Sequence, residues 1–235
     1  MAALRARTRV FDVGEHGVRA LNESLHVIPD GDGPARIEVH HPRGQHNVAV
    51  GARFPVDIEI TGHVGYYAAA MNEGASIHIH GSAGKGVAEN IMSGEVRVFG
   101  NASDAVASSG RGGLVVVTGD AASRCGISMK GVDIVIGGSI GHLGAFMAQA
   151  GRLVVCGDAG AGLGDSLYEA VLYVGGRIDG LGADAEVQPM TDDERMTLAA
   201  LLHRAGMSTE VSRFQRVGSA RRLYHFHVDQ DRIHG

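Results

Sequence analysis

The amino-acid sequence predicts an all-β protein: a single-stranded, right-handed parallel β-helix with coils of 19 residues, followed by a C-terminal helix and an extended tail. Three observations carry this prediction. Glycine recurs every 19 residues through the middle of the chain, a short strand-like segment precedes each of these glycines, and a small residue follows each one at a fixed distance. Repetition of a short unit at a fixed period is the sequence signature of a solenoid.

The repeated glycines, called marker glycines below, each end a segment rich in β-branched residues. They are Gly62, Gly81, Gly100, Gly119, Gly138, Gly157 and Gly176. The residues two and four positions before each marker are Ile, Val or Leu in every copy, as in the segments IEIT (58–61) and IHIH (77–80). This alternation predicts a strand with one face turned inward. Strands that recur at so short an interval must stack in parallel, about 4.8 Å apart.

A small residue stands seven positions after each marker glycine, where the coil is expected to narrow. This position holds Ala69, Ala88, Ala107, Gly126, Ala145, Gly164 and Ala183. A second glycine turn follows the small-residue stretch in most copies, so the repeat leaves no room for a helix. The LxxLxL and GGxGxD patterns of other solenoids are absent, and a period of 19 breaks the six-residue register of left-handed hexapeptide coils. A right-handed β-helix with irregular corners fits best.

The ends of the chain depart from the period, so we divide it into an N-terminal segment (1–35), the β-helix (36–188, with regular coils from 58) and a C-terminal helix and tail (189–235). Ile37 lies 21 residues before Ile58 and predicts a distorted first coil. The segment HNVAVG (46–51) predicts another short strand, and residues 17–26 a short helix. Thr191 and Glu194 form a capping-box pattern and Gly206 a stop signal, so a second helix is expected between them.

Composition and charge exclude several classes of function. The net charge of −5 gives no general attraction to nucleic acid. No segment approaches the ~20 apolar residues of a membrane helix, and no signal-peptide pattern is present. Cys125 and Cys156 are the only cysteines, too few for an iron–sulfur cluster, and are expected to be packing residues. We therefore expect a cytoplasmic protein with no nucleic-acid or membrane partner.

One row of outward-facing residues is informative. Three positions before the marker glycines stand Glu59, His78, Arg97, Val116, Val135, Val154 and Tyr173. The first three are polar, whereas the last four form an apolar stripe that should be covered. Either the C-terminal helix lies on this stripe or the stripe is an interface with a partner.

Histidines near this row raise the question of a metal site. His78 and His80 both point away from the core, and Glu59 or Asp104 on neighbouring coils could supply a further ligand. A metal site also needs partners that orient its ligands. The sequence favours solvated or interface histidines, and we expect no metal site.

The repeats with the runs GNAS, GDAA and GDAGAGLGDS resemble the GXGXG domain of glutamate synthases, the carboxy-terminal β-helix of the large subunit. Gly160, Gly162 and Gly164 carry the motif. The segments HNVAVG, GLGADAEV (180–187) and SARRLYHF (219–226) are most similar to the stand-alone version, the small β-helix subunit of N-methylglutamate synthase. The resemblance covers about residues 35 to 235. The β-helix subunits of formylmethanofuran dehydrogenase and of the formyltransferase/hydrolase complex share the repeat and are the alternative.

The resemblance implies a non-catalytic structural subunit of a hetero-oligomeric enzyme. In such complexes a glutaminase-like subunit and a subunit with FMN and an iron–sulfur cluster hold the active sites. The reaction would convert glutamate and methylamine to N-methylglutamate and ammonia, and the complex would be a methylamine–glutamate N-methyltransferase. We expect no catalytic, cofactor-binding or metal-binding residue in this chain. An independent enzyme with a row of acids and bases on the outside of the coils is disfavoured, because the outward row turns from charged residues to valines.

Overall fold

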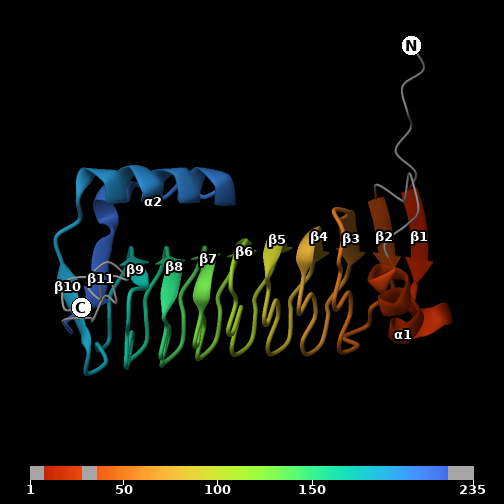
Figure 1. Cartoon of the computed structure of the whole chain (residues 1–235), viewed down its shortest axis with the longest axis horizontal. Helices are drawn as coiled ribbons and strands as arrows, with labels where there is room; N and C mark the ends of the chain where they lie inside the picture. The colour runs from red at the N-terminus through yellow and green to blue at the C-terminus, as the bar shows by residue number, and fades with distance from the viewer. Residues whose placement is uncertain (1–7, 28–35, 222–235) are drawn as a thin grey trace, which may run out of the picture.

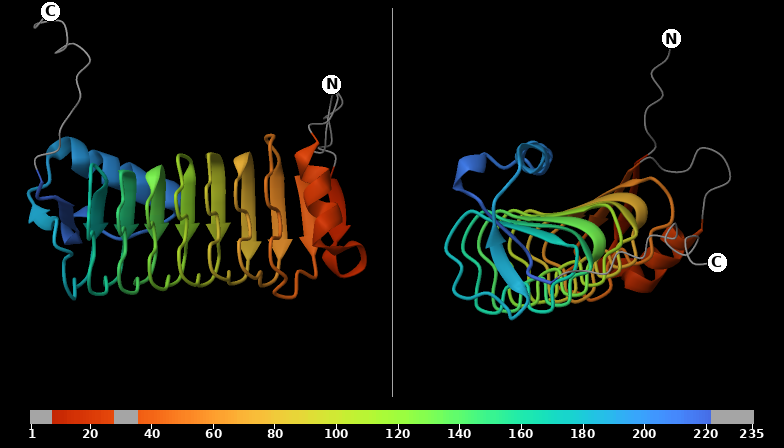
Figure 2. Two further views of the ribbon diagram at one scale, coloured as in Figure 1. Left: turned by 60° about the horizontal axis from the view of Figure 1, so that its bottom comes forward. Right: turned by 60° about the vertical axis from the view of Figure 1, so that its left-hand side comes forward.

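The protein is a straight column of stacked coils (Figure 1). The structure, a computed structural model, describes residues 8–27 and 36–221. Eleven strands form one sheet in the order β1-β2-β3-β4-β5-β6-β7-β8-β9-β11-β10. The pairs from β1 to β9 are all parallel. Viewed obliquely toward one end, the coils line up behind one another (Figure 2, right). The predicted parallel β-helix is confirmed.

The strands of the column lie where the 19-residue pattern places them, although several begin three or four residues before the predicted segment. They are β2 (Arg36–His40), β3 (Asp57–Thr61), β4 (Glu73–His80), β5 (Ser93–Val98), β6 (Leu114–Val117), β7 (Lys130–Ile136), β8 (Ala150–Val155) and β9 (Val171–Val174). Ile58 pairs with Ile77, and Ile134 with Leu153, so equivalent repeat positions are neighbours in the sheet. These side chains are fully buried in the core between the walls of each coil. Ile37 pairs with Ile58 despite their wider spacing, which confirms the distorted first coil.

Six of the seven residues of the small-residue row form the inside of a tight corner, whereas Ala183 in the last repeat is exposed. Ala69, Ala88, Ala107 and Ala145 are fully buried and have positive φ between 51° and 57°. A larger side chain at these positions would therefore overpack the core. It would also have to adopt a positive φ, which is unfavourable for bulky residues.

The segment 46–51 forms the same corner of the first coil, so the prediction of a strand there is wrong. Asn47 and Ala49 have φ of 59° and 57°, values incompatible with a strand. The segment is nevertheless tied to the next coil, because the Asn47 amide donates to the Tyr66 carbonyl and the Ala69 amide to the Val48 carbonyl.

A polar ladder runs along another corner and explains the marker glycines. The residue after each of the first six markers accepts a hydrogen bond from the backbone amide one coil further on; the acceptors are His63, Ser82, Asn101, Asp120, Ser139 and Asp158. Asn101 Oδ1, for example, lies 2.9 Å from the Asp120 nitrogen. A Cβ at Gly119 would lie 2.1 Å from that same oxygen. A Cβ at Gly138, Gly157 or Gly176 would likewise lie within 2.5 Å of the ladder atom of the preceding coil, so the ladder requires glycine at these steps.

Elements outside the repeat close the two ends of the column. At one end, β1 (Thr8–Asp12) pairs with β2, and α1 (Val13–His26) buries Leu21 and Leu25 in the core. The helix predicted for 17–26 thus begins earlier, with a break at Gly17, whose φ is 76°. At the other end, β11 (Gln215–Ser219) lies antiparallel between β9 and β10 (Ala185–Gln188).

The predicted C-terminal helix is α2 (Asp192–Ala205), with a short 3-10 turn, η1 (Val211–Arg213), between it and β11. The capping box of Thr191 and Glu194 is present, and Gly206 ends the helix with φ of 75°. Neither helix of the described ranges is long enough to cross a bilayer, each having 14 residues. The tail predicted beyond Arg221 lies outside the described residues.

Candidate functional site

The apolar stripe on the outer face of the sheet is covered by α2. Val116, Val135, Val154 and Tyr173 lie side by side in register, each no more than 1% exposed. They form one buried cluster with Leu198, Leu201, Leu202 and Ala205 of α2. Two views show the helix running across the strands from β9 toward the middle of the column (Figures 1 and 2). The first of the two predicted coverings is thus the observed one, and the stripe is not an open interface in this chain.

Arg97 lies next to Val116 in the outward row, on the preceding coil, and its side chain binds the C-terminal end of α2. Its Nη1 donates to the Ala205 carbonyl at 3.0 Å and its Nη2 to the Arg204 carbonyl at 2.5 Å. The last carbonyls of a helix have no partner within it and carry partial negative charge, so a guanidinium is favourable there. Glu95 binds Arg97 and also contacts Arg204. The change from valine to arginine in the outward row therefore marks where the covering helix ends.

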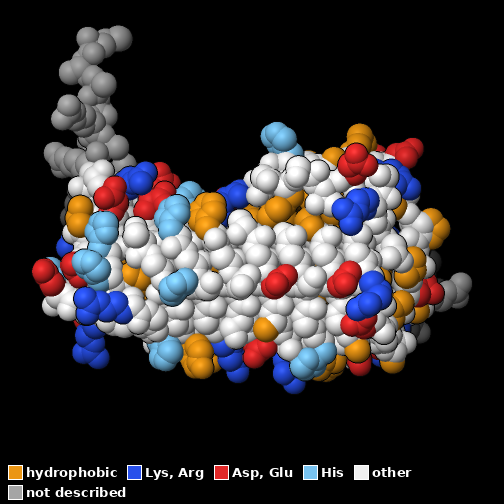
Figure 3. All heavy atoms as spheres, turned by 180° about the vertical axis from the view of Figure 1, so that it is seen from behind, with side chains coloured by type: hydrophobic (Ala, Val, Ile, Leu, Met, Phe, Trp, Pro, Cys, Tyr) orange, Lys and Arg blue, Asp and Glu red, His pale blue; other side chains and the backbone are white. Residues whose placement is uncertain are grey.

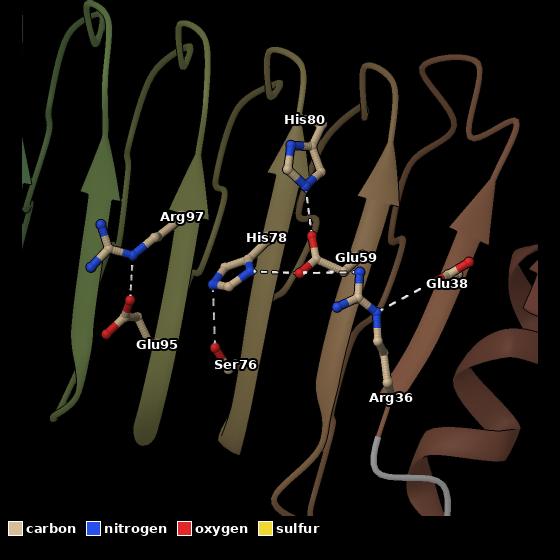
Figure 4. Close-up of polar contacts among 8 residues, drawn as sticks. All are labelled: Arg36, Glu38, Glu59, Ser76, His78, His80, Glu95 and Arg97. Carbon is tan, nitrogen blue, oxygen red and sulfur yellow. Dashed lines mark hydrogen bonds and ion pairs between the residues drawn. The ribbon is translucent and has the colours of Figure 1, made fainter. Parts of the chain in front are cut away.

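Beyond Arg97 the outer face of β2 to β5 is open and polar, and Glu59 is at its centre (Figure 4). His78 Nδ1 lies 3.0 Å from Glu59 Oε1, and His80 Nε2 lies 2.6 Å from Oε2. Arg36 is 3.8 Å from the same carboxylate on its other side. The His80 ring stacks on Phe99, with 4.9 Å between centroids. Figure 3 shows histidine and charged side chains gathered at this N-terminal end of the column, where α2 does not reach.

The electrostatics of this polar cluster favour an ionised Glu59. Burial opposes ionisation, but the hydrogen bonds from His78 and His80, together with the charge of Arg36, outweigh it and hold the pKa of Glu59 below its ordinary value. Both carboxylate oxygens are occupied by these contacts, so the group orients the two rings.

Within residues 8–27 and 36–221, no group of three or more His, Cys, Asp or Glu side chains is arranged to hold a metal ion. Asp104, the other conceivable ligand, instead accepts a hydrogen bond from the Ser123 amide at 3.0 Å.

The glycines of the GXGXG motif are required by the shape of the coil. A Cβ at Gly160 would lie 2.8 Å from the backbone of Gly141 and His142 in the preceding coil. Gly162 and Gly164 have φ of 77° and 69° and stand at the same two corner positions that Leu143 and Ala145 occupy one coil earlier, also with positive φ. The motif therefore lies within the wall of the column.

The two cysteines are poorly suited to act as nucleophiles. Cys125 is fully buried, and burial raises the pKa of its thiol to about 12. Burial also raises the pKa of Cys156, although a hydrogen bond with Thr209 and the charge of Arg213 act in the opposite direction. A thiol reacts as its thiolate, so both side chains are packing residues, as expected.

Sequence analysis identified the stripe and the histidines but missed the bonds that organise them. The contact of Arg97 with α2 joins residues more than 100 positions apart, and its only signal was the abrupt change of polarity in the outward row. The polar ladder had a visible signal, since a small polar residue follows most marker glycines.

Comparison with known proteins gives one close relative. No family model matches the chain. The protein is 52% identical over 221 residues to Protein GlxC of Rhizobium meliloti (strain 1021), an alignment that covers 94% of this chain and 97% of the relative. The similarity thus extends over nearly the whole chain rather than a single motif. At this identity and coverage, the chain belongs to the same family as Protein GlxC.

Proposed function

We propose that this chain is the non-catalytic β-helix subunit of a glutamate-synthase-like complex, and that the complex is an N-methylglutamate synthase. The observation that carries the proposal is the position of the motif glycines. Gly160, Gly162 and Gly164 are packed against neighbouring coils or hold left-handed corners, so the motif that links this chain to the GXGXG domain builds a scaffold.

The architecture suits a rigid spacer between other subunits. Adjacent coils are joined along the strands and at the corners by backbone hydrogen bonds, and each end carries elements of its own. Seven coils at about 4.8 Å give a wall roughly 30 Å long. A wall of fixed length can hold two active sites at a constant distance, which a flexible linker cannot do.

In this proposal the chemistry belongs to partner subunits. A glutaminase-like subunit handles the amide or amine, and a second subunit holds FMN and an iron–sulfur cluster. This chain has only two cysteines, and both are buried, so it supplies no cluster ligands. The complex would work in the cytoplasm and transfer methylamine onto glutamate with release of ammonia.

The test is affinity purification of the tagged chain from its native cells, followed by identification of the associated subunits and an assay with glutamate and methylamine. We expect a flavin-bearing subunit to co-purify and N-methylglutamate to form. The chain expressed alone should give no turnover above a buffer blank. Turnover by the lone chain, or co-purification of a formyl-processing subunit in place of the flavoprotein, would refute the proposal.

A further inference from the structure

A cleft of about 500 Å³ is lined by residues of the first coils, none of which belongs to the polar cluster. Its lining includes two exposed methionines, Met71 and Met92, which are 53% and 44% exposed. Arg53 and Arg111 also line it, as does Glu73. None of these five residues was singled out by the sequence pattern.

Backbone hydrogen bonds place the charged residues of the cleft in one row. The Glu73 amide donates to the Ala52 carbonyl, the Met92 amide to Asn72, and the Arg111 amide to Ile91, each at 2.8 Å. Arg53, Glu73, Met92 and Arg111 therefore follow one another on consecutive coils. With about 4.8 Å between coils, the two arginines are roughly 14 Å apart.

The two arginines outnumber Glu73, the one acidic residue that lines the cleft. Neither side chain forms an ion pair or hydrogen bond with another residue in the described part of the chain, and both are exposed. The whole chain has a net charge of −5, whereas the lining of this cleft, with two arginines and one glutamate, has the opposite sign. A surface of this composition fits a ligand with apolar and acidic groups.

We propose that this cleft docks an extended segment of a partner subunit that carries two acidic side chains about four residues apart. An extended chain advances about 3.3 Å per residue, so residues i and i+4 span about 13 Å and point to the same side. Each acid would meet one arginine, and an apolar side chain between them would contact the flexible methionines. Glu73 lies between the arginines and disfavours a third acid at the centre of the segment. This proposal rests on the proposed function, since it names how a subunit of that complex is held.

The first test is charge reversal in the tagged chain within the complex. The variant Arg53→Glu/Arg111→Glu should reduce co-purification of the flavin-bearing subunit by roughly tenfold or more, since it replaces attraction with repulsion. The matched control is Lys85→Glu/Arg124→Glu, which reverses two exposed cations that do not line the cleft. Thermal unfolding of each variant alone should match the wild type, because all four side chains are exposed.

The second test locates the segment directly. A photo-crosslinking amino acid at position 92 should join the cleft to a partner peptide, whose sequence is then read by mass spectrometry. We expect two acidic residues about four positions apart in that peptide. A peptide without such a pair, or a double reversal that leaves assembly intact, overturns the docking site alone. A wild-type chain that brings down no flavin subunit overturns the proposed function and this inference with it.

Discussion

Placing a charge under α2 tests the assignment of the inner and outer faces of the sheet. Val135 lies at the middle of the apolar stripe, fully buried between β7 and α2. Val135→Asp removes an apolar contact worth about 1.5–3 kcal/mol. It also places a carboxylate without a partner in an apolar contact, which costs about 3–5 kcal/mol where a buried charge stays unpaired.

The protein can limit this cost by releasing the helix. Undocking α2 would expose Leu198, Leu201 and Leu202, each worth about 1.5–3 kcal/mol of burial, and would break the contacts of Arg97 with the helix end. Each route costs about 4.5 kcal/mol or more, so we expect a loss of about 4.5–8 kcal/mol. For a chain of this size that corresponds to a fall in Tm of about 10 °C or more.

The assay is thermal and urea unfolding of the isolated chain, with hydrogen exchange of α2 as a second readout. The matched control is Val187→Asp on the edge strand β10, where the valine is 53% exposed. We expect the control to unfold close to the wild type. If Val135→Asp unfolds at the same temperature as the control and α2 keeps its protection, the inward and outward faces have been assigned incorrectly.

Three further predictions test the corner row, the polar cluster and the buried thiol. Ala107→Leu should lower the free energy of unfolding by about 1–3 kcal/mol, because Ala107 is buried and has a φ of 51°. An equal loss in the exposed control Ala161→Leu would show that the small-residue row does not face the core. Folding lowers the pKa of Glu59, so the ionised carboxylate stabilises the native state. This stabilisation is fully present above the pKa of the unfolded chain, about 4.3. It is lost as the pH falls through the lower pKa of the folded protein. In urea titrations, Glu59→Gln should thus have a lower free energy of unfolding than the wild type at neutral pH, and this difference should shrink in acid. A difference that does not change with pH would contradict a lowered pKa for Glu59. At mildly alkaline pH, iodoacetamide should leave Cys125 unmodified in the native chain and should modify it in urea. Mass spectrometry detects the modification. Rapid modification of Cys125 in the native chain would mean that the core opens at this residue.

The regular part of the fold was predictable because the residues that build each coil recur every 19 positions. Each 19-residue step repeats the same inward positions, so Ile58 and Ile77 had to become neighbours once the coils stacked. The corner at 46–51 was not predictable from its alternation of valines, because the same pattern suits a strand and two of its three left-handed residues, Asn47 and Ala49, are not glycines. The strands β1 and β11 lie outside the repeat, and β11 reaches its place between β9 and β10 only through long-range pairing.

The division of the outer face at Arg97 bears on how the protein could assemble with partners. One half is sealed by the chain's own helix, and the other carries Glu59, two histidines and Arg36, which largely compensate one another. Contacts on such surfaces gain specificity and rate of association from charge complementarity more than they gain affinity. A stable complex would then need several contacts along the column acting together, because a second contact within one assembly forms at high effective concentration. A rigid wall is well suited to this, since fixed spacing lets every contact be satisfied at once.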